Sequence, residues 1–188
     1  MNGRWGKIRR TRMRQWSLHY ARYLIEDCEP ERRVGETFDY FALEFWTTKR
    51  LKKYRQKKKT ATAIAGYQYQ VSAEVIYASK DSCVIDFGLL TVGRPDAIPS
   101  GCKEGDYVIG ELRLNLPLAV RGVPDSIIEG MKYKWLVNKI DADLTPYISH
   151  PDNPKFFFRD ESRIQFETVR STASVNAHDY VLLCTELA

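Results

Sequence analysis

The sequence predicts a mainly β (α+β) protein, with an antiparallel β-barrel over residues 67–188 and a basic helical extension over residues 1–66. The 188 residues suffice for one domain with a structured extension. After Gly66, apolar and polar residues alternate in several short segments, which is the period of half-buried strands. Before Gly66, apolar residues recur at three- and four-residue steps, which favours helices.

The extension is expected to begin with an amphipathic basic helix over residues 10–27. Its apolar residues fall on one helical face: Met13, Trp16, Tyr20, Tyr23 and Leu24. Pro30 disfavours helical geometry at Glu29, so the helix is expected to end before this pair. A second helix is favoured over residues 37–54, although the aromatic and threonine content of this segment also suits a strand.

Three strands are expected to open the barrel. In residues 67–77, tyrosine, valine and alanine alternate with glutamine, serine and glutamate, which is the clearest strand pattern in the chain. A turn at residues 79–82 leads into a second strand over residues 83–92, so these two strands should form a hairpin. Residues 107–116 repeat the alternation and predict the third strand.

The rest of the barrel region is expected to contain a short helix and three more strands. Residues 124–130 begin with proline and are long enough for a single helical turn. The fourth strand is predicted over residues 132–144, and residues 145–162, rich in proline and charge, are expected to form a loop. Two further strands are expected near the end of the chain, at residues 163–170 and 179–187.

This order of strands, short helix and further strands resembles the five-stranded OB-type barrel, a fold that often binds oligonucleotides on one face. Within residues 67–116, VIDFG at 84–88 and GDYVIG at 105–110 are similar to strands of S1-type RNA-binding barrels. The resemblance implies that Phe87, and also Tyr77, would stack on bases. An aromatic residue in an alternating strand also suits the core, and this region lacks the basic charge expected around phosphates.

Charge is distributed unevenly along the chain. Residues 1–59 carry 17 Lys or Arg against 7 Asp or Glu, a net +10, whereas residues 60–188 carry 12 against 17, a net −5. Such asymmetry indicates a polyanionic partner for the basic part, most often nucleic acid. A solvated tract that aids solubility, a targeting signal or contact with anionic lipid would give the same pattern. The candidate phosphate-binding residues are Arg9, Arg10, Arg12, Arg14, Lys49, Arg50, Lys52, Lys53, Arg55, Lys57, Lys58 and Lys59.

The sequence motifs predict no catalytic residues, no cofactor and no metal site. A glycine-rich phosphate loop and a GxSxG motif are both absent from the sequence. Asp141 and Asp143 could share a divalent metal with Glu161 or Glu167. An ordinary surface strand with two acids beside Lys139 is the simpler explanation. The cysteines form no CxxC pair and are expected to be buried or idle thiols: Cys28, Cys83, Cys102 and Cys184.

The run Phe156, Phe157 and Phe158 is the candidate protein interface. Three consecutive side chains of a strand cannot all point the same way, so one or two of these aromatic rings should reach the surface. Exposed aromatic residues beside charged ones are typical of protein interfaces. A buried anchor beneath the expected loop is the alternative.

These patterns predict a non-enzymatic, nucleic-acid-associated protein that grips RNA or DNA phosphates through its basic N-terminal segment without sequence preference. The alternative is a protein-interaction module, such as an inhibitor, immunity-type or assembly-accessory protein, and a metal-dependent hydrolase is a third possibility. No apolar run approaches the ~20 residues of a membrane span, and no signal-peptide core follows the basic start. An intracellular location in the cytoplasm, nucleoid or nucleus is expected.

Overall fold

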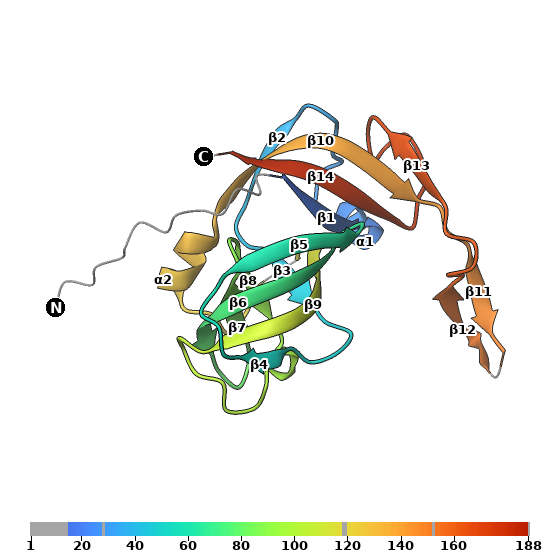
Figure 1. Cartoon of the computed structure of the whole chain (residues 1–188). Coiled ribbons are helices and arrows are strands. Elements are labelled where there is room, and N and C mark those ends of the chain that lie inside the picture. Colours follow the sequence, from blue (N-terminus) through green and yellow to red (C-terminus); the bar gives the residue numbers. More distant parts are fainter. Residues whose placement is uncertain (1–14, 28, 118–119, 152, 188) are drawn as a thin grey trace.

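The computed structural model describes residues 15–27, 29–117, 120–151 and 153–187, which form a mainly β protein with a closed five-stranded barrel (Figure 1). Strand β9 pairs with β6 on one side and with β3 on the other, and β8 and β7 complete the ring between them. The predicted mainly β class and the barrel are therefore confirmed. The barrel strands are β3 (Glu44–Trp46), β6 (Gln68–Ala78), β7 (Cys83–Asp86), β8 (Leu90–Gly93) and β9 (Tyr107–Asn115).

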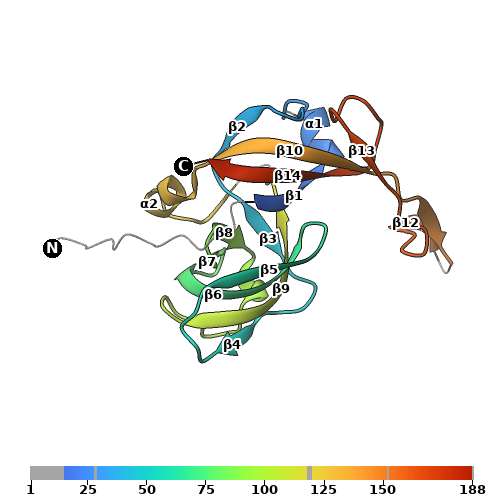
Figure 2. The same cartoon turned by 45° about the horizontal axis from the view of Figure 1, so that its top comes forward.

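A second, largely antiparallel group of strands continues from the barrel. Strand β14 lies between β1 and β10, and β10 also pairs with β2 and β13. Strand β1 joins barrel strand β9 in parallel, where His19 lies opposite Asn115. Figure 2 shows these strands lying above the barrel. Their bounds are β1 (Gln15–Ala21), β2 (Thr37–Tyr40), β10 (Tyr133–Asp143), β13 (Phe166–Val169) and β14 (Asp179–Leu187).

The remaining strands and helices lie around the barrel and the second group of strands. Strands β4 (Lys52–Tyr54) and β5 (Thr60–Ala65) pair with β9 and β6 of the barrel. Strands β11 (Tyr147–His150) and β12 (Asn153–Arg159) form a separate hairpin that extends away from the rest of the molecule in both views, and we call it the arm (Figures 1 and 2). The helical segments are α1 (Arg22–Asp27), η1 (Pro95–Ala97), α2 (Asp125–Ile128) and η2 (Glu129–Met131).

The prediction of a helix over residues 10–27 is wrong for Gln15–Ala21, because these residues form strand β1. Trp16, Leu18 and Tyr20 lie on one side of β1 at the two-residue spacing of a strand, and each is at most 2% exposed. Pairing of β1 with β14 and β9 makes this burial possible, and helical spacing alone could not predict it. Of the described residues of this segment, only the last six, which form α1, are helical.

Two further predicted segments also differ. The helix favoured over residues 37–54 is instead β2, β3 and β4, and the buried rings of Phe38, Tyr40 and Phe45 enter the core from these strands. The loop expected over residues 145–162 contains the arm, because its aromatic residues favour a pleated backbone over the coil indicated by its prolines. The predicted strands 67–77, 107–116 and 132–144 correspond closely to β6, β9 and β10.

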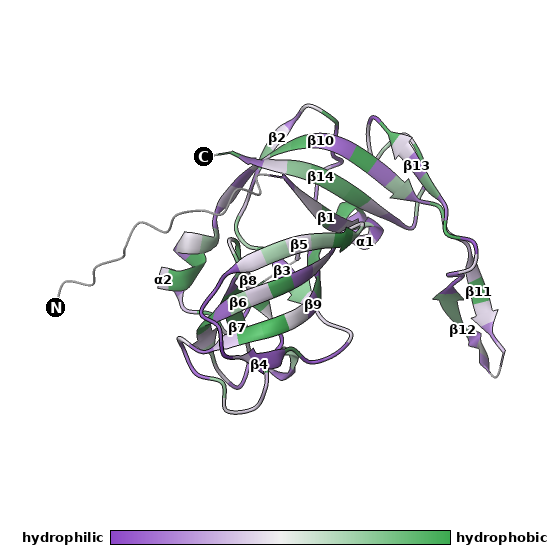
Figure 3. Ribbon diagram, viewed as in Figure 1, coloured by the Kyte–Doolittle hydropathy of each residue, from purple (hydrophilic) through white to green (hydrophobic). Residues whose placement is uncertain are grey.

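The hydrophobic core runs without a break from the barrel into the strands above it. Trp16 of β1 places its ring 5.4 Å from the ring of Tyr69 and 5.9 Å from the ring of Phe87. Phe87 is 1% exposed, so it belongs to the core and its ring is not free to stack on bases. Polar and apolar stretches follow one another along β10, as expected for a strand with one covered face, whereas the middle of β14 is apolar throughout (Figure 3).

Close approach of β3 to β8 completes the barrel. The two strands share one parallel pair, Glu44 with Val92, and the Val92 N–H donates to the Leu43 carbonyl at 2.9 Å. The ring of Phe45 lies directly over Gly93, where an added Cβ atom would overlap it. Gly93 therefore leaves the space in which Phe45 closes the ring of strands.

We expect Gly93→Ala to lower the free energy of unfolding by about 1–3 kcal/mol, because the new methyl group would displace the Phe45 ring. Urea denaturation measures this loss. In a Phe45→Leu background the same substitution should cost less, because the smaller side chain leaves room. Gly130→Ala is the control, since its Cβ would meet only the flexible end of Leu90, at 3.3 Å. Equal costs in both backgrounds would contradict this role of Gly93.

Candidate functional site

Residues 49–59, which we call the basic strap, cross the outside of the barrel. The strap runs from the end of β3, through β4, to the start of β5. Leu51 fastens it, because its side chain is buried and its N–H donates to the Ala97 carbonyl at 2.8 Å. Pairing of β4 with β9 fixes the next three residues. The eight cations of the strap are therefore displayed on an ordered segment.

Two of these cations are used within the protein. The Lys59 ammonium lies 2.6 Å from a Glu74 carboxylate oxygen and 2.7 Å from one of Asp86, whose side chain is 4% exposed. Lys53 makes a weaker, exposed pair with Asp106 at 3.4 Å. Burial lowers the pKa of Lys59, but hydrogen bonds and charges from both carboxylates outweigh it, and the pKa is raised. Lys59 is thus a structural residue, not a free phosphate ligand.

The other six cations of the strap remain available to a partner. Each is exposed, and none of them forms an ion pair with a carboxylate of the described residues. They are Lys49, Arg50, Lys52, Arg55, Lys57 and Lys58. The other predicted phosphate ligands, Arg9, Arg10, Arg12 and Arg14, lie outside the described residues.

A cleft of about 660 Å³ opens beside the start of the strap. The strap contributes Arg50 to its wall, and the loop before η1 contributes Arg94. Trp46 also lines the cleft and is 43% exposed. Trp46 is not among the site residues predicted from the sequence, although an aromatic residue shortly before a basic tract is a detectable signal. The other lining residues are Glu44, Phe45, Thr47, Thr48, Asp96 and Ala97.

The Trp46 indole has polar and aromatic neighbours. Burial raises the pKa of the Glu44 carboxyl, and the Trp46 side chain, two residues further along β3, partly lowers it. The ring of His19 lies 6.3 Å away, and His19 stacks on Tyr67 at 4.8 Å. The Arg113 guanidinium lies 5.8 Å from the centre of the Tyr67 ring. The indole therefore lies beside the His19 ring while much of its surface stays open to solvent.

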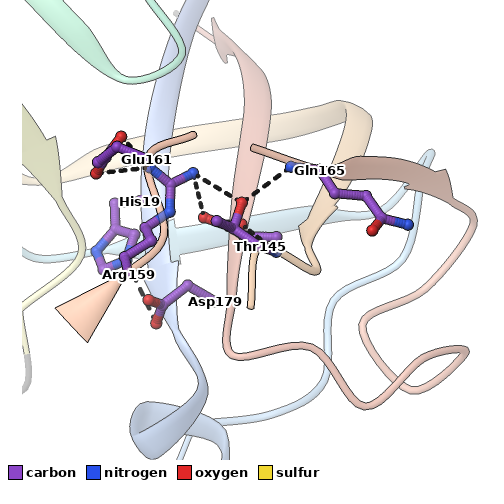
Figure 4. A network of polar contacts seen from close by, with 7 residues as sticks. His19, Thr145, Arg159, Glu161, Gln165 and Asp179 are labelled. Atoms are coloured by element: carbon purple, nitrogen blue, oxygen red, sulfur yellow. Dashed lines mark hydrogen bonds and ion pairs between the residues drawn. The ribbon is translucent and has the colours of Figure 1, made fainter. Parts of the chain in front are cut away.

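A second polar cluster fixes the base of the arm (Figure 4). Arg159, at the end of β12, pairs with Asp143 of β10 at 2.8 Å and with Glu161 at 3.2 Å. It also donates to the Thr145 hydroxyl at 3.2 Å, and that hydroxyl accepts the Gln165 N–H at 3.0 Å. Burial lowers the pKa of Arg159, but the nearby Asp143 and Glu161 raise it overall. These contacts tie the arm to the sheet above the barrel.

Beyond this base, the arm displays aromatic side chains. Phe156, Phe157 and Phe158 are 66%, 63% and 42% exposed, and Tyr147 on the facing strand is 43% exposed. Successive side chains of a strand point to opposite faces, so Phe157 lies on the face opposite to its two neighbours. The expectation that one or two of these rings reach the surface is exceeded, because all three do. The alternative of a buried anchor is wrong.

The acids considered as metal ligands are engaged elsewhere. Asp141 pairs with Lys139 at 2.8 Å and accepts the Thr168 hydroxyl at 2.7 Å, whereas Asp143 pairs with Arg159. Within the described residues, no group of three or more His, Cys, Asp or Glu side chains is suited to a metal ion. The thiols of Cys83, Cys102 and Cys184 are buried and free, as expected, and Cys28 lies outside the described residues. Burial raises the pKa of Cys83 and of Cys184 to about 12.

Comparison of the chain with protein-family models, with curated proteins and with solved structures found no match. The resemblance to OB-type and S1-type barrels therefore rests on the order of strands and the short motifs alone. In the described ranges, no helix has the length and apolar character needed to cross a membrane.

Because Lys59 has a structural role, its substitution should destabilise the protein more than substitution of its neighbour Lys58. We expect Lys59→Gln to lower the free energy of unfolding by about 1–3 kcal/mol, because the buried Asp86 carboxylate loses a charged partner. Lys58→Gln should change it by less than about 0.5 kcal/mol. Urea denaturation at pH 7 measures both, and equal effects would contradict the assignment.

The ion pairs of Lys59 with Asp86 and Glu74 also predict how stability depends on pH. An unperturbed lysine has a pKa of 10.5, and that of folded Lys59 is higher. The proton-linked stability is therefore complete below pH 10.5 and is lost as the pH rises through the folded pKa. The difference between the wild type and Lys59→Gln should stay constant from about pH 6 to 9 and shrink at higher pH.

Proposed function

We propose that this protein binds nucleic acid without sequence preference, and that the basic strap holds the phosphate backbone. The proposal describes a binding protein and includes no catalytic step. Its main support is the set of six exposed strap cations that no carboxylate of the described residues neutralises. Clustered lysine and arginine residues release counterions from a phosphate backbone when they bind it, and this release drives binding.

The fixed geometry of the strap supports a binding role over a role in solubility alone. A tract that only aids solubility needs no defined path, whereas this one is fastened at Leu51, at β4 and at Lys59. Its six free cations lie on both sides of β4 and follow one segment of chain. A phosphate backbone is a linear array of charges that such a segment can match.

The strength of this interaction should depend strongly on salt. If the six free cations each neutralise one phosphate, log affinity should fall with log salt concentration with a slope of about −5 for duplex DNA and about −4 for single strands. Fluorescence anisotropy with labelled oligonucleotides between 50 and 200 mM salt gives the slope. The variant K52Q/K57Q/K58Q should bind more weakly at every salt concentration and lower the slope by about 2 to 3.

A matched variant separates this site from general charge. Arg121, Lys134 and Arg170 are also exposed, and they lie outside the strap. R121Q/K134Q/R170Q removes the same charge and should leave the slope within about 1 of the wild-type value. Equal losses in both triple variants, or a wild-type protein that binds no oligonucleotide at 50 mM salt, would reject the proposal. R9Q/R10Q/R12Q/R14Q measures the share of the first basic cluster.

The arm favours a second candidate function, binding of a protein partner with an apolar surface. Phe156, Phe157 and Phe158 expose rings on both faces of a two-stranded hairpin, which has no further strand to cover either face within the described residues. Such a hairpin is marginally stable in isolation, and a partner that packs against its aromatic side chains would stabilise it. Exposed aromatic clusters of this kind are enriched in protein interfaces.

Copurification after nuclease treatment tests this second function. Proteins that bind the arm should remain bound to the wild type after nuclease digestion and should be lost from F156S/F157S/F158S. The three rings are exposed, so these substitutions should shift the free energy of unfolding by less than about 0.5 kcal/mol each. The strap variant K52Q/K57Q/K58Q is the control and should retain the same proteins. A triple serine variant that retains every partner would contradict an interface on the arm.

A further inference from the structure

We infer that the cleft beside Trp46 binds an unpaired base of a single-stranded nucleic acid, with the base stacked on the indole and a neighbouring phosphate on Arg50. This inference rests on the proposed function and deepens it, because it names the form of nucleic acid that the strap would prefer. It is carried by three features of the cleft: an exposed indole on a paired strand, an anchored guanidinium with free donors, and continuity with the strap.

The indole of Trp46 has the properties of a stacking platform. It is 43% exposed, although Trp16 and Trp135 in the same protein are at most 2% exposed. Its backbone is held by the pairing of Trp46 with Arg113 of β9, and the ring of His19 lies 6.3 Å from the indole, so part of the ordering needed to bind a ligand is already in place. Aromatic side chains hold bases of any type, because every base presents a π face.

Arg50 supplies the charge for a phosphate next to that base. Its Nε donates to the Asp96 carbonyl at 2.9 Å, which anchors the guanidinium at the edge of the cleft. Its two terminal nitrogens make no hydrogen bond to the described residues, so both are free to donate to phosphate oxygens. Arg94 differs, because it is paired with the Asp96 carboxylate at 3.3 Å. Arg50 is therefore the better phosphate ligand of the two.

The threonines of the remaining lining suit a nucleotide, and the Asp96 carboxylate that also lines the cleft is paired with Arg94. The hydroxyls of Thr47 and Thr48 form no hydrogen bond with the described residues and can donate to sugar or phosphate oxygens. The volume of about 660 Å³ falls within the range of about 300–1,000 Å³ found for small-molecule sites. Arg50 belongs to the strap, and Lys52 follows two residues later in β4, so a nucleic acid bound at Arg50 would continue toward the other strap cations.

Stacking on Trp46 requires an unpaired base. In a duplex both faces of each base are covered by neighbouring base pairs, so the indole could reach one only after unstacking, which costs a few kcal/mol. The strap alone binds the phosphates of either form. The cleft should therefore add affinity for single strands and none for duplexes.

Anisotropy titrations at 50 mM salt with a labelled 12-nucleotide oligothymidylate and a labelled 12-base-pair duplex test this inference. Trp46→Ala should weaken single-strand binding by about 5- to 150-fold and change duplex binding by less than about twofold. Trp46→Phe should recover most of the single-strand affinity, because it keeps a ring. Phe157→Ala removes an even more exposed ring on the arm and should change neither affinity.

The outcomes separate the two claims. Binding of both oligonucleotides by the wild type, with no selective loss in Trp46→Ala, overturns the inference and leaves the strap proposal standing. No binding by the wild type overturns the proposed function itself. Should Trp46→Ala not fold, tryptophan emission gives the answer, because oligothymidylate should quench the wild type more than the folded Trp46→Phe variant. Equal quenching in these two proteins also overturns the inference.

Discussion

The pairing of β9 is the constraint on which the rest of the structure depends. This strand closes the barrel between β6 and β3, holds β4 of the strap and joins β1 of the sheet above. The strap, the cleft and the second sheet are therefore placed by one strand. Loss of its alternating residues Val108, Leu112 and Leu114, all at most 1% exposed, would remove the common support of these features.

Burial determines which cations remain available. A charged group taken out of water is tolerated when it is paired, and Asp86 meets that requirement through Lys59. This internal pair lies at one end of the strap, and the hydrogen bond from Arg50 to the Asp96 backbone lies at the other. The carbonyl partner fixes Arg50 without neutralising its charge. The strap is thus held mainly by backbone and by its last lysine, and most of its charge faces solvent.

The sequence was a good guide to strands β6, β9 and β10 and a poor one to the N-terminal segment, for physical reasons. Strands β6, β9 and β10 bury one face each, so their alternation is visible without knowledge of their partners. In β1 the polar positions are also covered: His19 is 8% exposed because β14 and β9 flank it. Its spacing of apolar residues then matches a helix as well as a strand, and only tertiary pairing decides between them.

For the functional residues as well, the sequence predicts one part and tertiary structure decides the rest. The charge of the strap is a property of the sequence, and its eight cations were predictable from composition alone. Which two of them are neutralised depends on Glu74, Asp86 and Asp106. These carboxylates lie between 15 and 53 residues further along the chain than the lysines they pair with. They reach the strap because of how β6, β7 and β9 fold. The cleft depends on the approach of β3 to η1, which sequence periodicity does not encode.

The two candidate surfaces lie on different bodies of the molecule, and this separation bears on how they could act. The strap crosses the barrel around β4, whereas the arm leaves the sheet above it, and both views show the two well apart (Figures 1 and 2). The arm is fixed at its base by the ion pair of Arg159 with Asp143 of β10, a strand of the sheet above the barrel. A nucleic acid on the strap would leave Phe156, Phe157 and Phe158 uncovered. The geometry therefore allows one molecule to hold a polyanion and a protein partner at the same time, and binding at either surface requires no rearrangement of the other.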